Sequence, residues 1–230
     1  MNNTAIVAAI GVGNLIQNCV VETLFLSFNS SLENLCSQAA GAKNLVNCGI
    51  YLNRGTLMIM ISYLFVILIL IFSDEILQKF GQDPKVSGFT AQYLLYYMPG
   101  FFIYGLSDLN KKFLNSFRLN FIPMFAFTIS VFLHPLWSQY FVIEKDFKII
   151  GIAIAGIITN SITFISLKVF KNTRNDLTES KVPFFDKSTF DRAGLLEYFW
   201  LGAPLLLINF LDFWMWELMT LSSGMISVDH

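Results

Sequence analysis

The segment Gly55-Thr-Leu-Met-Ile-Met-Ile-Ser-Tyr-Leu-Phe-Val-Ile-Leu-Ile-Leu-Ile-Phe-Ser73 decides the fold, because it carries no charged residue along its whole length. About 20 apolar residues in an α-helix cross the roughly 30 Å of hydrocarbon in a bilayer. This segment therefore predicts a transmembrane helix. Similar apolar runs precede and follow it, and we expect six spans near residues 5–31, 55–73, 88–107, 120–142, 149–170 and 199–226.

The overall composition agrees with a chain that lies mostly in lipid. Of its 230 residues, 55% are hydrophobic and only 13% are charged, about half the charged fraction of an ordinary soluble domain. The sequence therefore predicts an all-α, polytopic membrane protein. The net charge of −1 and the scattered basic residues argue against a nucleic-acid partner.

Neither a cofactor nor an enzyme active site is expected. The three cysteines, Cys19, Cys36 and Cys48, have no metal-ligand spacing and do not form a disulfide framework. No Ser/His/Asp or metal-ligand constellation lies within the predicted spans. We therefore expect a non-enzymatic membrane protein that binds no metal.

One long polar connection divides the chain. Residues 171–198 carry many charged side chains around Pro183, and such a composition cannot remain in hydrocarbon. We expect residues 1–170 to form a five-helix membrane part, 171–198 a linker, and 199–230 the first helix of a second part that is cut short.

The distribution of basic residues predicts the orientation. Eleven of the 15 Lys and Arg residues lie in or beside the loops after the first, third and fifth spans. The positive-inside rule places these loops in the cytoplasm and both termini outside. An uncharged external N-terminus is an awkward start for a membrane protein, and we expect the chain to be part of a larger transporter.

Ionisable residues at membrane depth are costly and usually face a cavity or a partner. Glu22, Asp212 and Glu217 are such residues, and the last two project about 140° apart on one helix. Glu217 lies beside Trp214 and Trp216, and an apolar, aromatic setting disfavours a charged carboxylate. Glu217 is therefore a candidate proton site, although each of these acids could instead be a neutral structural group.

Proline in the apolar runs suggests helices that bend. Pro204 removes a backbone donor inside the last span, which suits a gating role in alternating access but is also compatible with static packing. Phe is abundant, with 24 residues, and aromatic rings can bind planar organic cations through cation–π contacts.

The stretch Leu32-Glu33-Asn34-Leu35-Cys36-Ser37-Gln38-Ala39-Ala40-Gly41-Ala42-Lys43 resembles a signature of the eukaryotic multidrug and toxic compound extrusion (MATE) family. Tyr51-Leu52-Asn53-Arg54 and Ile76-Leu77-Gln78-Lys79-Phe80-Gly81-Gln82 follow in the family's order, as does Phe113-Leu114-Asn115. The last span, with Leu211 through Leu218, is similar to the family's seventh helix. The resemblance implies family helices two to seven, with residues 171–198 as the cytoplasmic linker between two lobes.

The resemblance implies a secondary active antiporter that exports organic cations or other xenobiotics in exchange for protons or sodium. It gives Glu217 the role of an ion-coupling residue and makes Gln38, within the signature, a cavity candidate. The resemblance also implies that the protein lies in the plasma membrane or in a vacuolar or other internal membrane.

Two alternatives to an active antiporter stay open. The first is a lipid-linked oligosaccharide flippase of the same superfamily, which should carry cationic cavity residues. The second is an inactive structural fragment, because a single lobe lacks a partner against which to rock. Activity could then require a second lobe or self-association.

Overall fold

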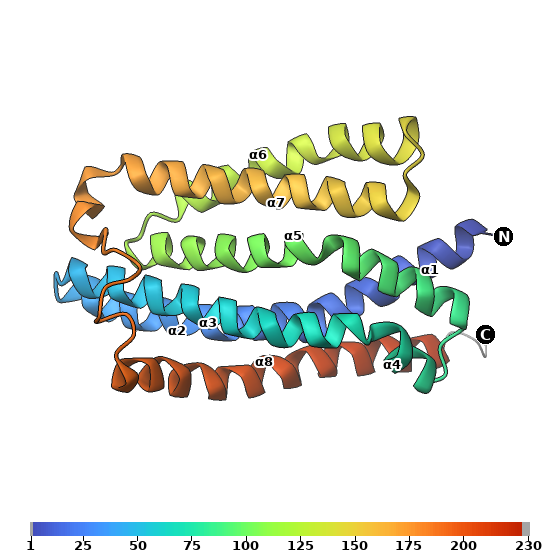
Figure 1. The fold of residues 1–230 in the computed structure, drawn as a ribbon, viewed down its shortest axis with the longest axis horizontal. Coiled ribbons are helices and arrows are strands. Elements are labelled where there is room, and N and C mark those ends of the chain that lie inside the picture. Colours follow the sequence, from blue (N-terminus) through green and yellow to red (C-terminus); the bar gives the residue numbers. More distant parts are fainter. Residues whose placement is uncertain (1, 227–230) are drawn as a thin grey trace.

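The computed structural model describes the backbone of residues 2–226 and the side chains of residues 4–216 and 219. Within that range the chain is all-α (Figure 1). The first long helix is continuous, with α1 (Asn2–Ile16), the π-helical segment η1 (Gln17–Glu22) and α2 (Thr23–Gly41). It is followed by α3 (Leu45–Ile71) and the short α4 (Ser73–Lys79), then by α5 (Pro84–Ser116).

The second half of the chain adds three more long helices. They are α6 (Phe121–Ser138), which continues as the π-helical η2 (Gln139–Glu144), α7 (Lys148–Thr173) and α8 (Arg192–Ile226). The 3₁₀ segment η3 (Asn175–Ser180) lies between α7 and α8. The all-α polytopic fold predicted from the sequence is confirmed.

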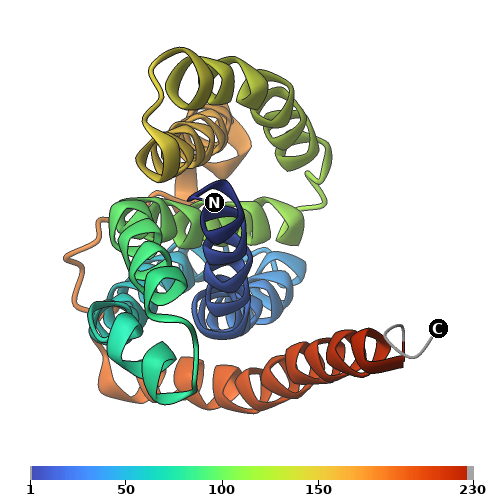
Figure 2. The same cartoon turned by 90° about the vertical axis from the view of Figure 1, so that its right-hand side faces the viewer.

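In the described part of the chain, five helices are long and apolar enough to cross a membrane, namely Thr4–Gly41, Leu45–Ile71, Phe121–Glu144, Lys148–Thr173 and Arg192–Trp216. The predicted span 88–107 lies in α5, which is not among these five. Helix α5 lies between the pair formed by α6 and α7 and the group formed by α1, α2 and α3 (Figures 1 and 2). Protein rather than lipid surrounds much of it, and its composition can therefore be less apolar.

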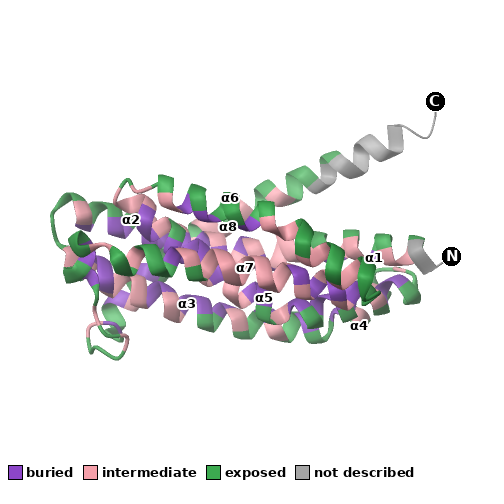
Figure 3. Cartoon of the chain, turned by 90° about the horizontal axis from the view of Figure 1, so that it is seen from above, coloured by how far each residue is buried: buried purple, intermediate pink, exposed green. Residues whose placement is uncertain are grey.

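Several predicted spans were shorter than the helices of the structure. Helix α3 begins at Leu45 rather than 55, α5 continues to Ser116 rather than 107, and α8 begins at Arg192 rather than 199. Hydropathy misses these helix ends because they carry polar and charged residues, such as Asn53 and Arg54 in α3 and Arg192 and Glu197 in α8. Figure 3 shows the resulting pattern, with buried residues concentrated along the inner helices and exposed ones along the outer faces.

The core is formed by two groups of apolar side chains. One joins α2, α3 and α5 at the end where the linker lies, around Leu32, Leu109 and Phe113. The other joins η1, α2, α3, α5 and α7 toward the opposite end, around Phe25, Ile59 and Phe101. Helix α5 contributes to both groups and is the structural axis of the bundle.

The segment between α7 and α8 is held against the start of α3 by the Tyr51–Arg54 stretch. Asn53 Nδ2 donates to the carbonyls of Val182 and Pro183, both at 3.1 Å. Arg54 is only 8% exposed and its Nη2 donates to the Ser188 carbonyl at 2.8 Å. Polar side chains of α3 therefore fix the segment that leads into α8.

Helix α8 packs on α2 through a buried hydrogen bond that suggests a stability test. Tyr198 is fully buried, and its hydroxyl donates to the Phe28 carbonyl at 2.8 Å. We expect Tyr198→Phe to lower the free energy of unfolding by about 1–2 kcal/mol, because a buried polar partner is lost. Thermal melting followed by circular dichroism checks this, and Tyr96→Phe, at an exposed position, should leave the transition in place.

Candidate functional site

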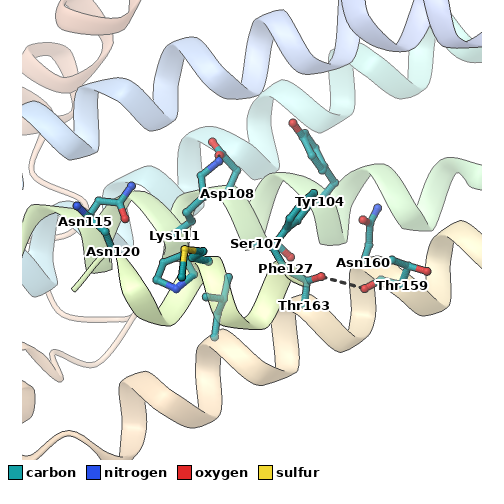
Figure 4. Close-up of a pocket in the computed structure, with 13 residues that line it drawn as sticks. Tyr104, Ser107, Asp108, Lys111, Asn115, Asn120, Phe127, Thr159, Asn160 and Thr163 are labelled. Carbon is teal, nitrogen blue, oxygen red and sulfur yellow. Dashed lines mark hydrogen bonds and ion pairs between the residues drawn. The ribbon is translucent and has the colours of Figure 1, made fainter. Parts of the chain in front are cut away.

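A pocket with a volume of about 460 Å³ lies between α5, α6 and α7 (Figure 4). Helix α7 packs along both α5 and α6, while α5 and α6 touch each other little, and the space opens between them. Most of the polar lining comes from α5 and α7, and includes Tyr104, Asp108, Lys111, Thr159 and Asn160. The facing wall on α6 is apolar and includes Met124 and Phe127.

The α5 residues of the pocket follow the period of the helix. Tyr104, Asp108, Lys111 and Asn115 are separated by three or four positions, so that they share one face. Asn115 lies near the end of α5 that precedes the loop predicted to be cytoplasmic. The pocket therefore extends from the middle of the bundle toward that end.

Asp108 is the buried acid of this pocket. It is 4% exposed, and its Oδ2 accepts a hydrogen bond from Asn29 Nδ2 of α2 at 2.9 Å. Its Oδ1 forms an ion pair with Lys111 Nζ, whose side chain is 45% exposed. Asn29 Nδ2 also donates to the Gly105 carbonyl at 3.1 Å, which fixes the amide against α5. The carboxylate is thus held between Asn29 and Lys111, and Lys111 is the more exposed partner.

The polar residues of α7 are also held in defined orientations. Asn160 Nδ2 donates to Tyr97 Oη at 2.9 Å and to the Gly100 carbonyl at 3.2 Å, both on α5. Thr159 Oγ1 lies 2.7 Å from His134 Nδ1 of α6 and accepts a bond from Trp137 Nε1 at 3.2 Å. These bonds give the pocket a polar wall with a fixed geometry.

This arrangement can bind an organic cation. Asp108 supplies a negative charge, and the rings of Tyr104 and Phe127 supply faces for cation–π contacts. Lys111 is the ion-pair partner of this carboxylate, and its side chain is the more exposed of the two.

Glu22, one of the predicted site residues, is not among the residues that line this pocket. It ends the π-helical η1, is half-buried, and accepts a hydrogen bond from Gln17 Nε2 at 3.1 Å. It also interacts electrostatically with Tyr104, which lines the pocket. A π-helical turn displaces the side chains of a helix locally and is frequent at functional sites.

The candidates on α8 lie apart from the pocket. Figure 1 places α8 on the side of the bundle opposite α6 and α7. Asp212 and Pro204 are exposed on α8, and Trp214 and Trp216 are 50% and 70% exposed. The side chain of Glu217 lies outside the described residues. The structure therefore does not bring Asp212 and Glu22 into one site.

Gln38 is exposed on α2, in the part of the helix near Gly41. The signature stretch around it is anchored by Glu33, whose Oε2 accepts a hydrogen bond from Lys112 Nζ of α5 at 2.8 Å. This contact ties the stretch to the same helix that carries Asp108.

The sequence reasoning missed Asp108 and Lys111 because it ended the third span at residue 107. The missed signal was the spacing of polar residues at 104, 108, 111 and 115, which predicts one polar helix face.

Long apolar helices around a partly polar pocket define an integral, multi-pass membrane protein. The MatE family profile matches residues 3–139, and the chain belongs to this family. The predicted MATE resemblance is confirmed.

Relatives and solved structures agree with the family. The chain is 28% identical to protein DETOXIFICATION 17 of Arabidopsis thaliana over 205 residues, which cover 89% of this chain and 42% of that protein. Protein DETOXIFICATION 33 of the same plant is 29% identical over 64% of this chain and 30% of its own length. The chain thus spans less than half the length of these relatives.

The fold is that of a eukaryotic MATE transporter. The crystal structure of the eukaryotic MATE transporter AtDTX14 superposes with a TM-score of 0.84 at 21% identity, covering 94% of this chain and 48% of that one. At this identity the likeness establishes the fold alone.

Proposed function

We propose that the protein works in secondary active export of organic cations, with protons or sodium as the exchanged ion, and that the pocket around Asp108 binds the cation. Family membership supports a role in multidrug or toxic compound efflux. The single observation that carries the choice of substrate is the buried Asp108 carboxylate beside aromatic rings.

Coupling follows from competition for a carboxylate. A cation that enters the pocket must displace Lys111 from Asp108, and a proton or sodium ion must in turn displace the cation on the other side of the membrane. Glu22 interacts electrostatically with Tyr104, which lines the pocket. Binding of the exchanged ion at Glu22 would therefore be coupled to cation binding in the pocket. Glu217 retains its role as an ion-coupling candidate on α8.

The second half of the transport machinery would come from a further lobe, because alternating access in such transporters uses paired repeats. Two copies of this chain, or this chain with another half, would supply it. Reconstitution at low and at high protein-to-lipid ratio compares the single chain with associated copies, because a high ratio favours association by mass action.

A transport assay tests the proposed function. The purified chain is reconstituted into liposomes with an acidic lumen, and uptake of tetraethylammonium is followed. We expect uptake above that of protein-free liposomes, and collapse of the proton gradient with an ionophore should abolish it. A sodium gradient without a pH difference distinguishes the coupling ion. Uptake equal to that of empty liposomes under all these conditions would contradict autonomous antiport.

A further inference from the structure

A second pocket, with a volume of about 350 Å³, lies where the linker meets α3 and α7. Asn53 comes from α3, Lys171 and Asn172 come from the end of α7, and Lys181 comes from the linker. This pocket is separate from the one around Asp108, and transport does not explain it. The positive-inside rule places it at the cytoplasmic surface of the membrane.

Two lysines, Lys171 and Lys181, are among the described residues that line this pocket, and no carboxylate is among them. Lys171 Nζ donates to Asn110 Oδ1 at 2.9 Å, and Lys181 Nζ donates to the Asn172 carbonyl at 3.2 Å. Lys171 Nζ also lies 5.5 Å from the centroid of the Phe113 ring. Both hydrogen-bond acceptors are neutral, and because an ammonium carries three N–H donors, each lysine retains a donor for a further ligand. Lys168 and Lys181 are both near enough to Lys171 to repel it.

The acidic residues of the neighbouring segment either pair with arginines or do not line the pocket. Asp176 accepts hydrogen bonds from Arg174 Nε at 2.9 Å and Nη2 at 2.7 Å. Asp191 forms an ion pair with Arg54 at 3.9 Å. Glu179 is exposed and is not among the described residues that line the pocket. The local charge of the pocket is therefore positive.

We propose that this pocket binds a phosphate group, either on an anionic lipid headgroup or as a free phosphate ion. Two lysines in a pocket at the cytoplasmic surface suit a phosphomonoester, and basic pockets between membrane helices bind phosphorylated headgroups. The volume lies at the lower end of the range for small-molecule sites. Because Lys171 belongs to α7 and Lys181 to the linker, the bound phosphate would join the two.

Lysine footprinting tests the proposal without any transport assay. The chain is placed in nanodiscs and acetylated with a membrane-impermeant reagent, and the rate at each lysine is read by mass spectrometry. With phosphatidylinositol 4-phosphate present at ten times its Kd, acetylation of the exposed Lys181 should slow about tenfold. Lys145 and Lys148, at the opposite end of the bundle, should react at unchanged rates and serve as internal controls.

The lipid and ion arms separate the two sources of phosphate. Protection by the phosphoinositide but not by inorganic phosphate identifies a lipid headgroup, and protection by both identifies any phosphate. Equal protection by phosphatidylserine at matched membrane charge would overturn the proposal, because surface attraction would then explain it. No protection in either arm would also overturn it.

A variant confirms the role of the pocket. Lys171→Gln removes one ammonium but keeps a side chain that can bond to Asn110. We expect it to abolish the protection of Lys181, whereas Lys145→Gln should retain it. Circular dichroism verifies that both variants are folded, and persistent protection in a folded Lys171→Gln protein would contradict a shared site.

Discussion

Asp108→Asn is expected to weaken the binding of tetraphenylphosphonium by about thirtyfold or more. Removing one partner of a desolvated charge pair costs about 2 kcal/mol or more, and 1.4 kcal/mol is a factor of ten in Kd. The amide oxygen can still accept the hydrogen bond from Asn29, and Lys111 can reach solvent, so the fold should persist. Equilibrium binding of the radiolabelled cation to the purified chain checks the prediction.

Lys111→Gln should have the opposite effect on the same measurement. Lys111 competes with the organic cation for the Asp108 carboxylate, and a half-exposed ion pair contributes up to about 1 kcal/mol. Its removal should therefore tighten cation binding by up to about fivefold. A neutral dye serves as the control, since neither variant should alter its affinity. Equal weakening by both variants would indicate general damage rather than competition for a charge.

Gly49→Ala is expected to release the linker from α3. A Cβ atom at residue 49 would lie within 3 Å of the Ser180 carbonyl and of Val182, and backbone cannot move aside as a flexible side chain does. Overpacking of this kind costs about 1–3 kcal/mol, which corresponds to roughly five- to 150-fold more of the open form. Trypsin cleavage after Lys181 or Lys187, both exposed in the linker, should accelerate accordingly.

Gly88→Ala is the matched control for this substitution. Gly88 also lies in a long helix, but no heavy atom outside its own helix lies within 4 Å of the added Cβ. Alanine favours a helix over glycine by about 0.5–1 kcal/mol, so this variant should be at least as stable as the parent. If the linker of Gly49→Ala is cleaved no faster than that of Gly88→Ala, the docking of the linker on α3 is wrong.

The sequence predicted the membrane helices because long apolar runs identify them, and the Gly55–Ser73 segment allowed no other interpretation. It could not predict the ends of α3 and α5, where polar side chains bond to the linker and to other helices, respectively. Asp108 was missed for this reason, since its partner Asn29 is 79 residues away in the chain. Pairings of that kind follow from packing and not from local pattern.

The Tyr51–Arg54 stretch illustrates the same limit in a different way. Its resemblance to a family motif was visible in the sequence, but its purpose was not. The structure shows that Asn53 and Arg54 bind the linker, so that the motif maintains a connection between α3 and the start of α8. The sequence also could not predict that Glu22 interacts with Tyr104, a residue that lines the pocket.

Photolabelling tests most directly whether the pocket around Asp108 binds organic cations. Ethidium azide is photolysed on the chain, and the labelled residues are mapped by mass spectrometry. We expect labels on α5, α6 and α7, among residues such as Tyr104, Met124 and Phe127, with labelling suppressed by excess tetraphenylphosphonium and by Asp108→Asn. Labels confined to α8, or unaffected by Asp108→Asn, would contradict the assignment of this pocket.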